Sequence, residues 1–397
     1  MRLLSLSIFF LSFLSGCTKE EIPSEVTTLI DQIKQQYAPD KRVAHFEIKP
    51  ELVEGTLHLK GSTNLPDALK TLHSKLEEKG IAFKEEIEQL PSKELQGQTF
   101  GVVRLSVANI RSKPKHSAEL ATQATLGTPL KVYKKEKDWY WVQTPDGYLS
   151  WLDKDGFTIM EAAAYQDWLE SSKVVYLPDF GFAYQTTNRQ DGIVSDLLAG
   201  NILQLIAQEG SFTKVGFPDG RTAYVATAEL MTYETWMATR NPIVDNILQT
   251  AYSFLGRPYL WGGTSGKGVD CSGFTKTVFY LNGILLPRDA SQQVHTGSAI
   301  ATDSTLANLE AGDLLFFGRK ASAEQKEKIT HVAIYMGNGQ IVHSAGIVKI
   351  ESLKRGEPNF AEDRLKTLVR AKRPLQSIGE NGILPLGSLP QYRIAEK

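Results

Sequence analysis

The segment Asp270–Phe274 constrains the chain more than any other, because it places a cysteine where a glycine-rich loop becomes a helix. The loop spans residues 257–266, and residues 273–280 after it carry an apolar face of helical period. At such a junction Cys271 faces unpaired backbone N–H groups and the positive end of the helix dipole. Both favour the thiolate, the nucleophilic form of cysteine. A free cysteine is more often a small buried apolar side chain, so its neighbours must decide between the two interpretations.

Two histidines downstream lie on a predicted β-hairpin. His331 belongs to the alternating segment 329–336, which ends at the turn Gly337–Gly339, and His343 lies on the return segment 340–345. Paired strands would bring the two rings close enough for one to orient the other. Either histidine alone would more often be structural or exposed. Together with the cysteine, they indicate the nucleophile, base and orienting group of a cysteine hydrolase.

The region 241–374 resembles the NlpC/p60 family of papain-like cysteine peptidases, which cut bacterial cell-wall peptides. Six segments carry the resemblance, in the order and spacing of the family: 258–263, Asp270–Phe274, 287–293, 311–317, 331–335 and the strand with His343. The resemblance implies that Cys271 is the nucleophile, His331 the base and His343 the group that holds His331 in its productive tautomer. It also implies that the backbone N–H of Cys271 and the Tyr259 hydroxyl stabilise the oxyanion.

A subgroup of this family has the same order of domains, and it implies further residues for the substrate. In that subgroup the first SH3-like barrel closes one end of the active site and recognises the free amino terminus of the peptide. The positions that match its substrate-binding groups, or lie beside the groove, are Glu119, Tyr148, Asp270, Ser272, Asp289 and Ser291. A carboxylate pair, Glu119 with Asp270, would compensate an ammonium that leaves water. The alternatives are a solvated surface residue for Glu119 and helix capping for Asp289 and Ser291.

Residues 1–16 are predicted to be a lipoprotein signal peptide and not part of the fold. Arg2 gives a positive start, and the apolar stretch 3–14 is too short to span a bilayer. The small residues before Cys17 resemble a bacterial lipobox, so Cys17 would become the lipid-modified first residue after cleavage. The alternative is an ordinary secretory signal. We therefore expect a lipid anchor in the bacterial cell envelope, periplasmic or associated with the outer membrane.

The composition limits which partners and cofactors the protein could have. The 397 residues include 44 basic and 45 acidic side chains with no basic block, which argues against nucleic acid as a partner. The chain has two cysteines, and acylation of Cys17 would leave Cys271 unpaired in an exported protein, which favours a reactive thiol. No cysteine or histidine cluster has metal-ligand spacing, so we expect no metal and no other cofactor. We expect a monomer.

The predicted fold class is a multidomain α+β protein. Residues 17–95 should form a small α+β domain, with helices at Ser24–Tyr37 and 65–79, Ser24 as N-cap, and strands at 43–48, 55–59 and 81–87. Short strands separated by turns over 97–157 resemble a bacterial SH3-like barrel, and 172–235 repeats the plan after a helical linker at 160–171. The papain-like domain would span 240–375, before a tail at 376–397 that is packed over the surface or loosely ordered.

The resulting hypothesis is a murein peptide hydrolase. It would cleave the bond between γ-D-glutamate and an L-diamino acid, meso-diaminopimelate or L-lysine, in muropeptides with a free N-terminal L-Ala, as peptidoglycan recycling requires. Two alternatives stay open. One is a non-catalytic peptidoglycan-binding lipoprotein, and the other is a different papain-like chemistry, an N-acetylmuramoyl-L-alanine amidase or an acyltransferase.

Overall fold

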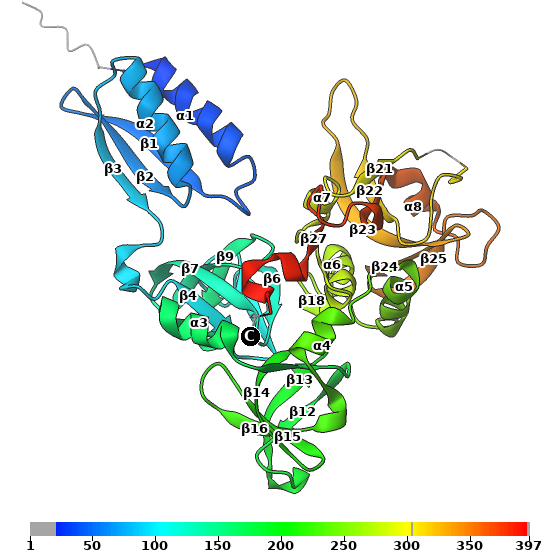
Figure 1. Ribbon diagram of the computed structural model, residues 1–397. Helices are drawn as coiled ribbons and strands as arrows, with labels where there is room; N and C mark the ends of the chain where they lie inside the picture. Colours follow the sequence, from blue (N-terminus) through cyan, green and yellow to red (C-terminus); the bar gives the residue numbers. More distant parts are fainter. Residues whose placement is uncertain (1–20, 303–304, 395–397) are drawn as a thin grey trace, which may run out of the picture. The chain divides into compact units, whose positions relative to one another are not determined.

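A computed structural model describes residues 21–302 and 305–394, and it divides them into two compact units (Figure 1). The first unit contains residues 21–39 and 45–89. The second contains residues 40–44 and 90–394. The predicted signal peptide and Cys17 lie outside the described residues. Within the described ranges, no helix is long and apolar enough to cross a bilayer.

The first unit is a three-stranded sheet with two helices, as the sequence predicts. Its elements are α1 Ser24–Tyr37, β1 Phe46–Val53, β2 Thr56–Thr63, α2 Pro66–Glu78 and β3 Lys84–Gln89. β2 lies between β1, antiparallel to it, and β3, parallel to it, because α2 carries the chain back across the sheet. The helices bury apolar stripes of period 3.6. Ser24 is the first helical residue and Pro23 occupies the N-cap, so the N-cap prediction was wrong.

The predicted domain 17–95 is interrupted, because the segment Asp40–Ala44 makes its contacts with the second unit. The backbone N–H of Leu149 donates to the Arg42 carbonyl at 2.7 Å, and the Gln143 side chain donates to the Val43 carbonyl at 3.2 Å. The first unit also ends at Gln89, earlier than predicted. Residues 90–95 pack on the first barrel instead, where Leu95 is buried in the core.

Two seven-stranded barrels follow, and the second repeats the first strand for strand. The first contains β4 Phe100–Val103, β5 Val107–Arg111, β6 Leu120–Thr125, β7 Pro129–Glu136, β8 Trp139–Gln143, β9 Leu149–Asp153 and β10 Phe157–Met160. After α3, Ala162–Glu170, the second contains β11 Lys173–Tyr176, β12 Phe180–Tyr184, β13 Ile193–Leu198, β14 Ile202–Glu209, β15 Phe212–Gly216, β16 Thr222–Ala226 and β17 Leu230–Thr232. The strand order is β10-β4-β7-β8-β9-β5-β6 in one and the equivalent β17-β11-β14-β15-β16-β12-β13 in the other. The predicted repeat is therefore confirmed.

The last domain packs a helix with its N-terminus at Cys271 against an antiparallel sheet. Its helices are α4 Tyr233–Ala238, α5 Val244–Ser253, α6 Cys271–Leu281, α7 Ala290–Gln293 and α8 Glu362–Thr367. Its main sheet has the order β21-β26-β22-β23-β24-β25, from Ser298–Ile300, Leu368–Arg373, Leu314–Arg319, Lys328–Gly337, Gln340–Ala345 and Ile347–Ser352. Two small pairs complete it: β18 Thr264–Ser265 with β19 Gly268–Val269, and β20 Ile284–Leu285 with β27 Leu384–Pro385. The predicted hairpin that carries both histidines is β23 with β24.

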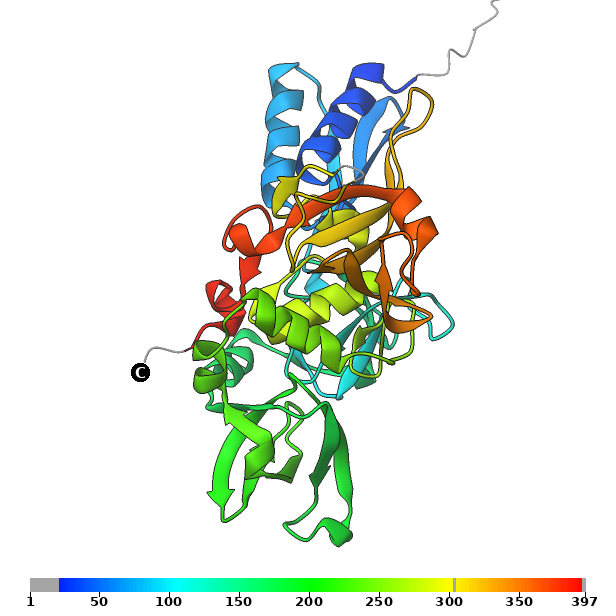
Figure 2. The same cartoon turned by 90° about the vertical axis from the view of Figure 1, so that its right-hand side faces the viewer.

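The core of this domain lies between α6 and the sheet. Phe274 and Val278 of α6 pack against Val332 and Ile334 of β23, and all four are fully buried. The first barrel is attached to the same helix, since Lys276 of α6 forms a 2.7 Å ion pair with its Asp146, whose side chain is almost completely buried. Figure 2 shows the second barrel (green) as a lobe at one end of the second unit.

The residues after the main sheet are packed, not loose. Leu386 and Tyr392 are buried in a cluster with Trp236 of α4 and Leu285 of β20, and the Tyr233 hydroxyl donates to the Tyr392 carbonyl at 2.7 Å. Of the two alternatives predicted for the tail, the described residues 376–394 therefore agree with the packed one.

The close contact of Gly127 with Ile202 of the second barrel predicts how a substitution at Gly127 changes the stability of the protein. Gly127 and Gly220 share a backbone φ of +84°, but a Cβ on Gly127 would lie 2.5 Å from the Ile202 carbonyl oxygen, whereas a Cβ on Gly220 has nothing within 4 Å. Gly220→Ala should therefore cost only the left-handed strain of about 1–2 kcal/mol. Gly127→Ala should cost roughly 1–3 kcal/mol more, because overpacking adds to that strain. Urea-unfolding midpoints of the two variants make the comparison, and equal midpoints would contradict it.

Candidate active site

Cys271 is the first residue of α6, where the loop 257–269 enters the helix. Asp270 is the N-cap, and its Oδ1 accepts a hydrogen bond from the Gly273 backbone N–H at 2.7 Å. The backbone N–H groups of Ser272 and Val332 point to the cysteine sulfur and favour its thiolate form. Val332 follows His331 on β23, so the thiol lies against the strand that carries the predicted base.

The two histidines are in contact, and a carboxylate continues the chain of contacts. Nε2 of His331 lies 2.7 Å from Nδ1 of His343, and Nε2 of His343 lies 2.9 Å from Oε2 of Glu351 on β25. This contact is within ion-pair distance, but Nε2 of His343 has no partner with hydrogen-bond geometry among the described residues. Glu351 is held in turn by Lys349 at 2.5 Å.

These distances are compatible with one arrangement of the protons on the two rings. If His343 carries its proton on Nε2, towards the carboxylate, its Nδ1 is free to accept the Nε2 proton of His331. Nδ1 of His331 is then unprotonated and able to accept a proton from the nucleophile. Sequence reasoning did not identify Glu351. The sequence signal for Glu351 is weak, because it depends on how the strand after Gly346 pairs with the strand of His343. In the structure His343 pairs with Lys349, and Glu351 lies two residues further along.

Burial acts against charge on both reacting groups. It raises the pKa of the Cys271 thiol to about 11, against the lowering effect of the backbone N–H groups. It lowers the pKa of His331 to about 2, and the charges of Arg364, His343 and Lys349 add to the effect. Burial therefore opposes the charged form of each group, while the backbone N–H groups of Ser272 and Val332 favour the thiolate that the sequence predicts.

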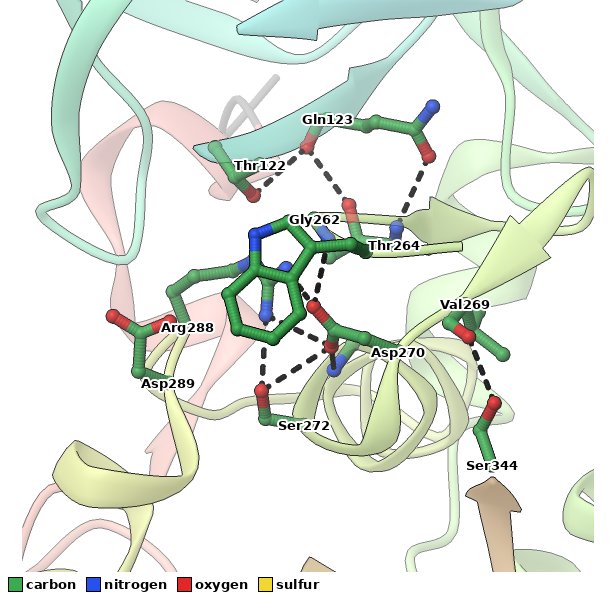
Figure 3. Close-up of polar contacts among 12 residues, drawn as sticks. Thr122, Gln123, Gly262, Thr264, Val269, Asp270, Ser272, Arg288, Asp289 and Ser344 are labelled. Carbon is green, nitrogen blue, oxygen red and sulfur yellow. Dashed lines mark hydrogen bonds and ion pairs between the residues drawn. The ribbon is translucent and has the colours of Figure 1, made fainter. Parts of the chain in front are cut away.

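Asp270 also compensates a buried cation that the sequence analysis did not assign a role. Arg288 is 1% exposed and donates to Oδ1 of Asp270 at 3.1 Å and to Oδ2 at 2.6 Å. The same carboxylate accepts the N–H groups of Gly262 and Gly273 and the Ser272 hydroxyl (Figure 3). Five donors occupy the approximately four lone-pair positions of one carboxylate. This geometry gives Asp270 a structural role, and Asp270 also lines the cleft of Cys271.

Glu119 is exposed just before β6 of the first barrel and lines the same cleft as Cys271. Its Oε1 accepts the indole N–H of Trp261 at 2.7 Å, and no cation of the described residues forms an ion pair with it. The first barrel is fixed to the catalytic loop here, because Thr264 donates its N–H to the Gln123 side chain and its hydroxyl to the Gln123 carbonyl, both at 3.0 Å (Figure 3).

Three further residues that the sequence predicts to bind substrate also line this cleft: Tyr148, directly before β9 of the first barrel, Asp289 and Ser291. Tyr148 is buried, and burial followed by the negative charge of Asp289 raises its pKa. Asp289 and Ser291 accept hydrogen bonds from one guanidinium nitrogen of Arg42 at 2.8 and 2.9 Å. Asp289 also caps α7, as the capping alternative predicts, and it lines the cleft. Arg42 is also bonded to Asp40, and no local pattern in the sequence indicates that this segment reaches the cleft.

Tyr259 lines the cleft, which has a volume of about 520 Å3. Burial, followed by the neighbouring charges of Cys271 and Asp270, raises the pKa of its hydroxyl to about 12. The hydroxyl therefore stays protonated and can donate a hydrogen bond to an oxyanion. Within residues 21–302 and 305–394, no group of three or more His, Cys, Asp or Glu side chains could hold a metal ion.

Comparisons with known proteins agree with the domain order. A family model described as "NlpC/P60 family" matches residues 256–364, and one described as "Bacterial dipeptidyl-peptidase Sh3 domain" matches residues 110–157. A γ-D-glutamyl-L-lysine dipeptidyl-peptidase from Bacillus cereus is 30% identical over 254 residues, which cover 62% of this chain and 73% of that protein. The protein of the same name from Bacillus subtilis is 33% identical over 240 residues, 57% of this chain and 72% of the relative.

A solved structure is similar as well. The crystal structure of an NlpC/P60 family protein from Bacillus cereus superposes with a TM-score of 0.59 at 25% sequence identity. The superposition covers 70% of this chain and all of that one. The similarity thus extends over more than the peptidase domain alone.

The contact between His343 and Glu351 predicts a change in pH dependence. Burial lowers the pKa of His343 to about 4, against a raising effect of the Glu351 charge, while Arg364 and Lys349 lower it further. In Glu351→Gln the pKa of the histidine pair should fall, so activity should be lost at a lower pH than in the parent. Because the amide still accepts a hydrogen bond, kcat should fall only on the order of 10-fold, less than the 10²–10⁴ that a base supplies.

The measurement is the pH profile of kcat/KM for the parent, Glu351→Gln and Glu351→Ala. The alanine variant should lose more activity than the glutamine variant, because it leaves the Nε2 proton without an acceptor. An acid limb at the same pH in all three proteins would show that Glu351 has no influence on the base.

Proposed function

The chain belongs to the NlpC/P60 family and is a cysteine peptidase that hydrolyses peptidoglycan peptides, and from this premise we propose its cleavage site. We propose that it cuts the bond between γ-D-glutamate and an L-diamino acid in peptides with a free N-terminal L-Ala. The printed names of the Bacillus relatives describe a γ-D-glutamyl-L-lysine bond and removal of a dipeptide. Such a specificity suits peptides already released from the wall, as in recycling. L-Ala joined to muramic acid has no free amine.

The observation that carries this proposal is the carboxylate of Glu119 in the cleft of Cys271. It is exposed, oriented by Trp261 and without an ion-pair partner among the described residues. A substrate ammonium would supply the missing charge, and hydrogen bonds between charged groups are stronger than neutral ones. Asp270, the second expected partner, is already neutralised by Arg288. We therefore assign the amine to Glu119 alone.

The reaction follows from the positions of the other groups. The sulfur of Cys271 forms a bond to the γ-carbonyl carbon while its proton passes to His331. The backbone N–H of Cys271 and the Tyr259 hydroxyl donate to the oxyanion. The C–N bond then breaks, and the leaving amine takes the proton from His331. Water attacks the thioester carbonyl, gives its proton to His331, and releases L-Ala-D-Glu, after which His331 returns the proton to the thiolate.

Product masses test the cleavage site. L-Ala-γ-D-Glu-diamino acid should release L-Ala-D-Glu, its N-acetylated twin should be cleaved far more slowly, and Cys271→Ala should be inactive yet folded by circular dichroism. Equal cleavage of both peptides would remove the free-amine requirement. Turnover by Cys271→Ala would refute the nucleophile. Binding to sacculi without any turnover would support the wall-binding alternative, and release of L-Ala from a muramoyl peptide would support the amidase.

Glu119→Gln tests the amine site separately. The variant keeps the shape and an acceptor for Trp261 but loses the charge, so KM for the free-amine peptide should rise about 10-fold or more, as expected for a lost charged hydrogen bond of about 1.5–3 kcal/mol. The acetylated peptide should be cleaved at its original slow rate. If KM for the free-amine peptide is unchanged, Glu119 is a solvated surface residue.

We also propose that the mature protein is a monomer held in the bacterial cell envelope by lipid on Cys17. The support is the sequence alone: an apolar stretch too short to span a bilayer, followed by small residues and a cysteine. Cells that express the full chain should incorporate labelled fatty acid into the parent and not into Cys17→Ser, and only the parent should sediment with membranes. Equal labelling of both would sink the proposal.

A further inference from the structure

A second hollow lies beside the catalytic cleft and is lined by four cations. We call it the basic groove; its volume is about 760 Å3, and its charged wall includes Arg319, Lys328, Lys349 and Arg364. These residues come from β22, β23, β25 and α8, and β24 lies between β23 and β25 in the sheet (Figure 1). The groove shares Lys328 and Thr330 with the cleft of Cys271, so the two hollows adjoin.

Most of the positive charge in the basic groove is not compensated. Lys349 is paired with Glu351, but within residues 21–302 and 305–394 neither Arg319, Lys328 nor Arg364 forms an ion pair with a carboxylate. The groove also contains Glu362, which is paired with Lys366 at 3.2 Å, and Asp363, which has no ion pair in the same ranges. Three unpaired cations therefore face one unpaired carboxylate. A surface of this kind attracts anions.

The groove lies next to the base. Arg364 is positioned over the ring of Phe317, 5.8 Å from its centroid, and that ring lies 5.8 Å from the ring of His331. Phe317 therefore lies between Arg364 and the imidazole. His331 is the group that protonates the leaving amine in the proposed reaction. The part of the substrate attached to that amine must therefore lie near this side of the site.

The chemistry of the leaving group matches the charge of the groove. The released amine belongs to a diamino acid, whose α-carboxylate is on the carbon next to the nitrogen. Lysine carries an ammonium at the far end of its side chain, whereas diaminopimelate carries a carboxylate there besides its amine. An Arg pair is well suited to a carboxylate, because the guanidinium binds it in bidentate fashion. A basic groove would repel the far end of lysine and accept that of diaminopimelate.

We propose that the basic groove binds the leaving part of the substrate, and that Arg319, Lys328 and Arg364 select a diamino acid with a far-end carboxylate over lysine. This inference rests on the proposed cleavage site and adds the identity of the residue after the cut. It distinguishes this chain from the relatives whose printed names contain L-lysine.

Three matched tripeptides test the proposal: L-Ala-γ-D-Glu followed by meso-diaminopimelate, by the same residue with its far carboxylate amidated, or by L-lysine. The amidated peptide keeps the size and loses one charge. The parent protein should show a kcat/KM about 10-fold or more higher for the acidic peptide than for the other two, as a charged hydrogen bond predicts. The preference should weaken at high salt, because the Debye length falls from about 10 Å at 0.1 M to about 3 Å at 1 M.

Variants test whether residues of the basic groove cause the preference for the acidic peptide. Arg319→Met and Arg364→Met should each reduce the ratio of kcat/KM between the acidic and amidated peptides, and the double variant should reduce it most. The ratio cancels any general loss of activity. Lys320→Met is the matched control, since it removes an exposed cation next to Arg319 that does not line the groove, and it should keep the ratio.

Failure of this inference can be distinguished from failure of the proposed function. Cleavage of all three peptides at similar rates would contradict the proposed role of the basic groove and leave the proposed cleavage site unaffected. Cleavage of none would overturn the proposed function. In that case the Kd values of the three peptides for Cys271→Ala still decide the groove: tighter binding of the acidic peptide supports it, and equal binding overturns it.

Discussion

Arg288 is almost completely buried, and a guanidinium removed from water is tolerated only when an anion and hydrogen bonds compensate its charge. Asp270 provides that anion from the residue before the nucleophile. The same carboxylate caps α6, ties down the backbone of Gly262 and accepts the Ser272 hydroxyl. One ion pair thus fixes the helix that begins at Cys271, the loop in front of it and the segment 287–293. Loss of either partner would leave a buried charge, at a cost of about 3–5 kcal/mol.

The catalytic histidines depend on a second buried arrangement, built from three neighbouring strands. The rings of His331 and His343 are buried, and burial lowers the pKa of both. Glu351 lies at the far end and offers the only acceptor for the outer ring nitrogen among the described residues. A polar chain of this kind is productive only if each member has a partner. The antiparallel register of β23, β24 and β25 provides those partners.

The cleft is also lined by residues from outside the papain-like domain. The first barrel supplies Glu119 and Tyr148, and its strand β6 is bonded to the catalytic loop through Gln123. Arg42 arrives from a segment about 230 residues before Cys271 and bonds to Asp289. Both contributions come from outside the papain-like domain, so the walls of the cleft depend on the packing of the whole second unit.

The sequence by itself determined the features that are local or periodic. Cys271 at a loop–helix junction, the histidine hairpin and the repeated barrel plan are encoded by neighbours a few residues apart, and each was found at its predicted place. The role of Asp270, the burial of Arg288, and the positions of Glu351 and Arg42 were decided by the tertiary structure alone. Their partners lie on other strands or in other domains, and the cost of burying a charge depends on everything packed around it. No pattern of adjacent residues records that environment, so only the folded chain could reveal it.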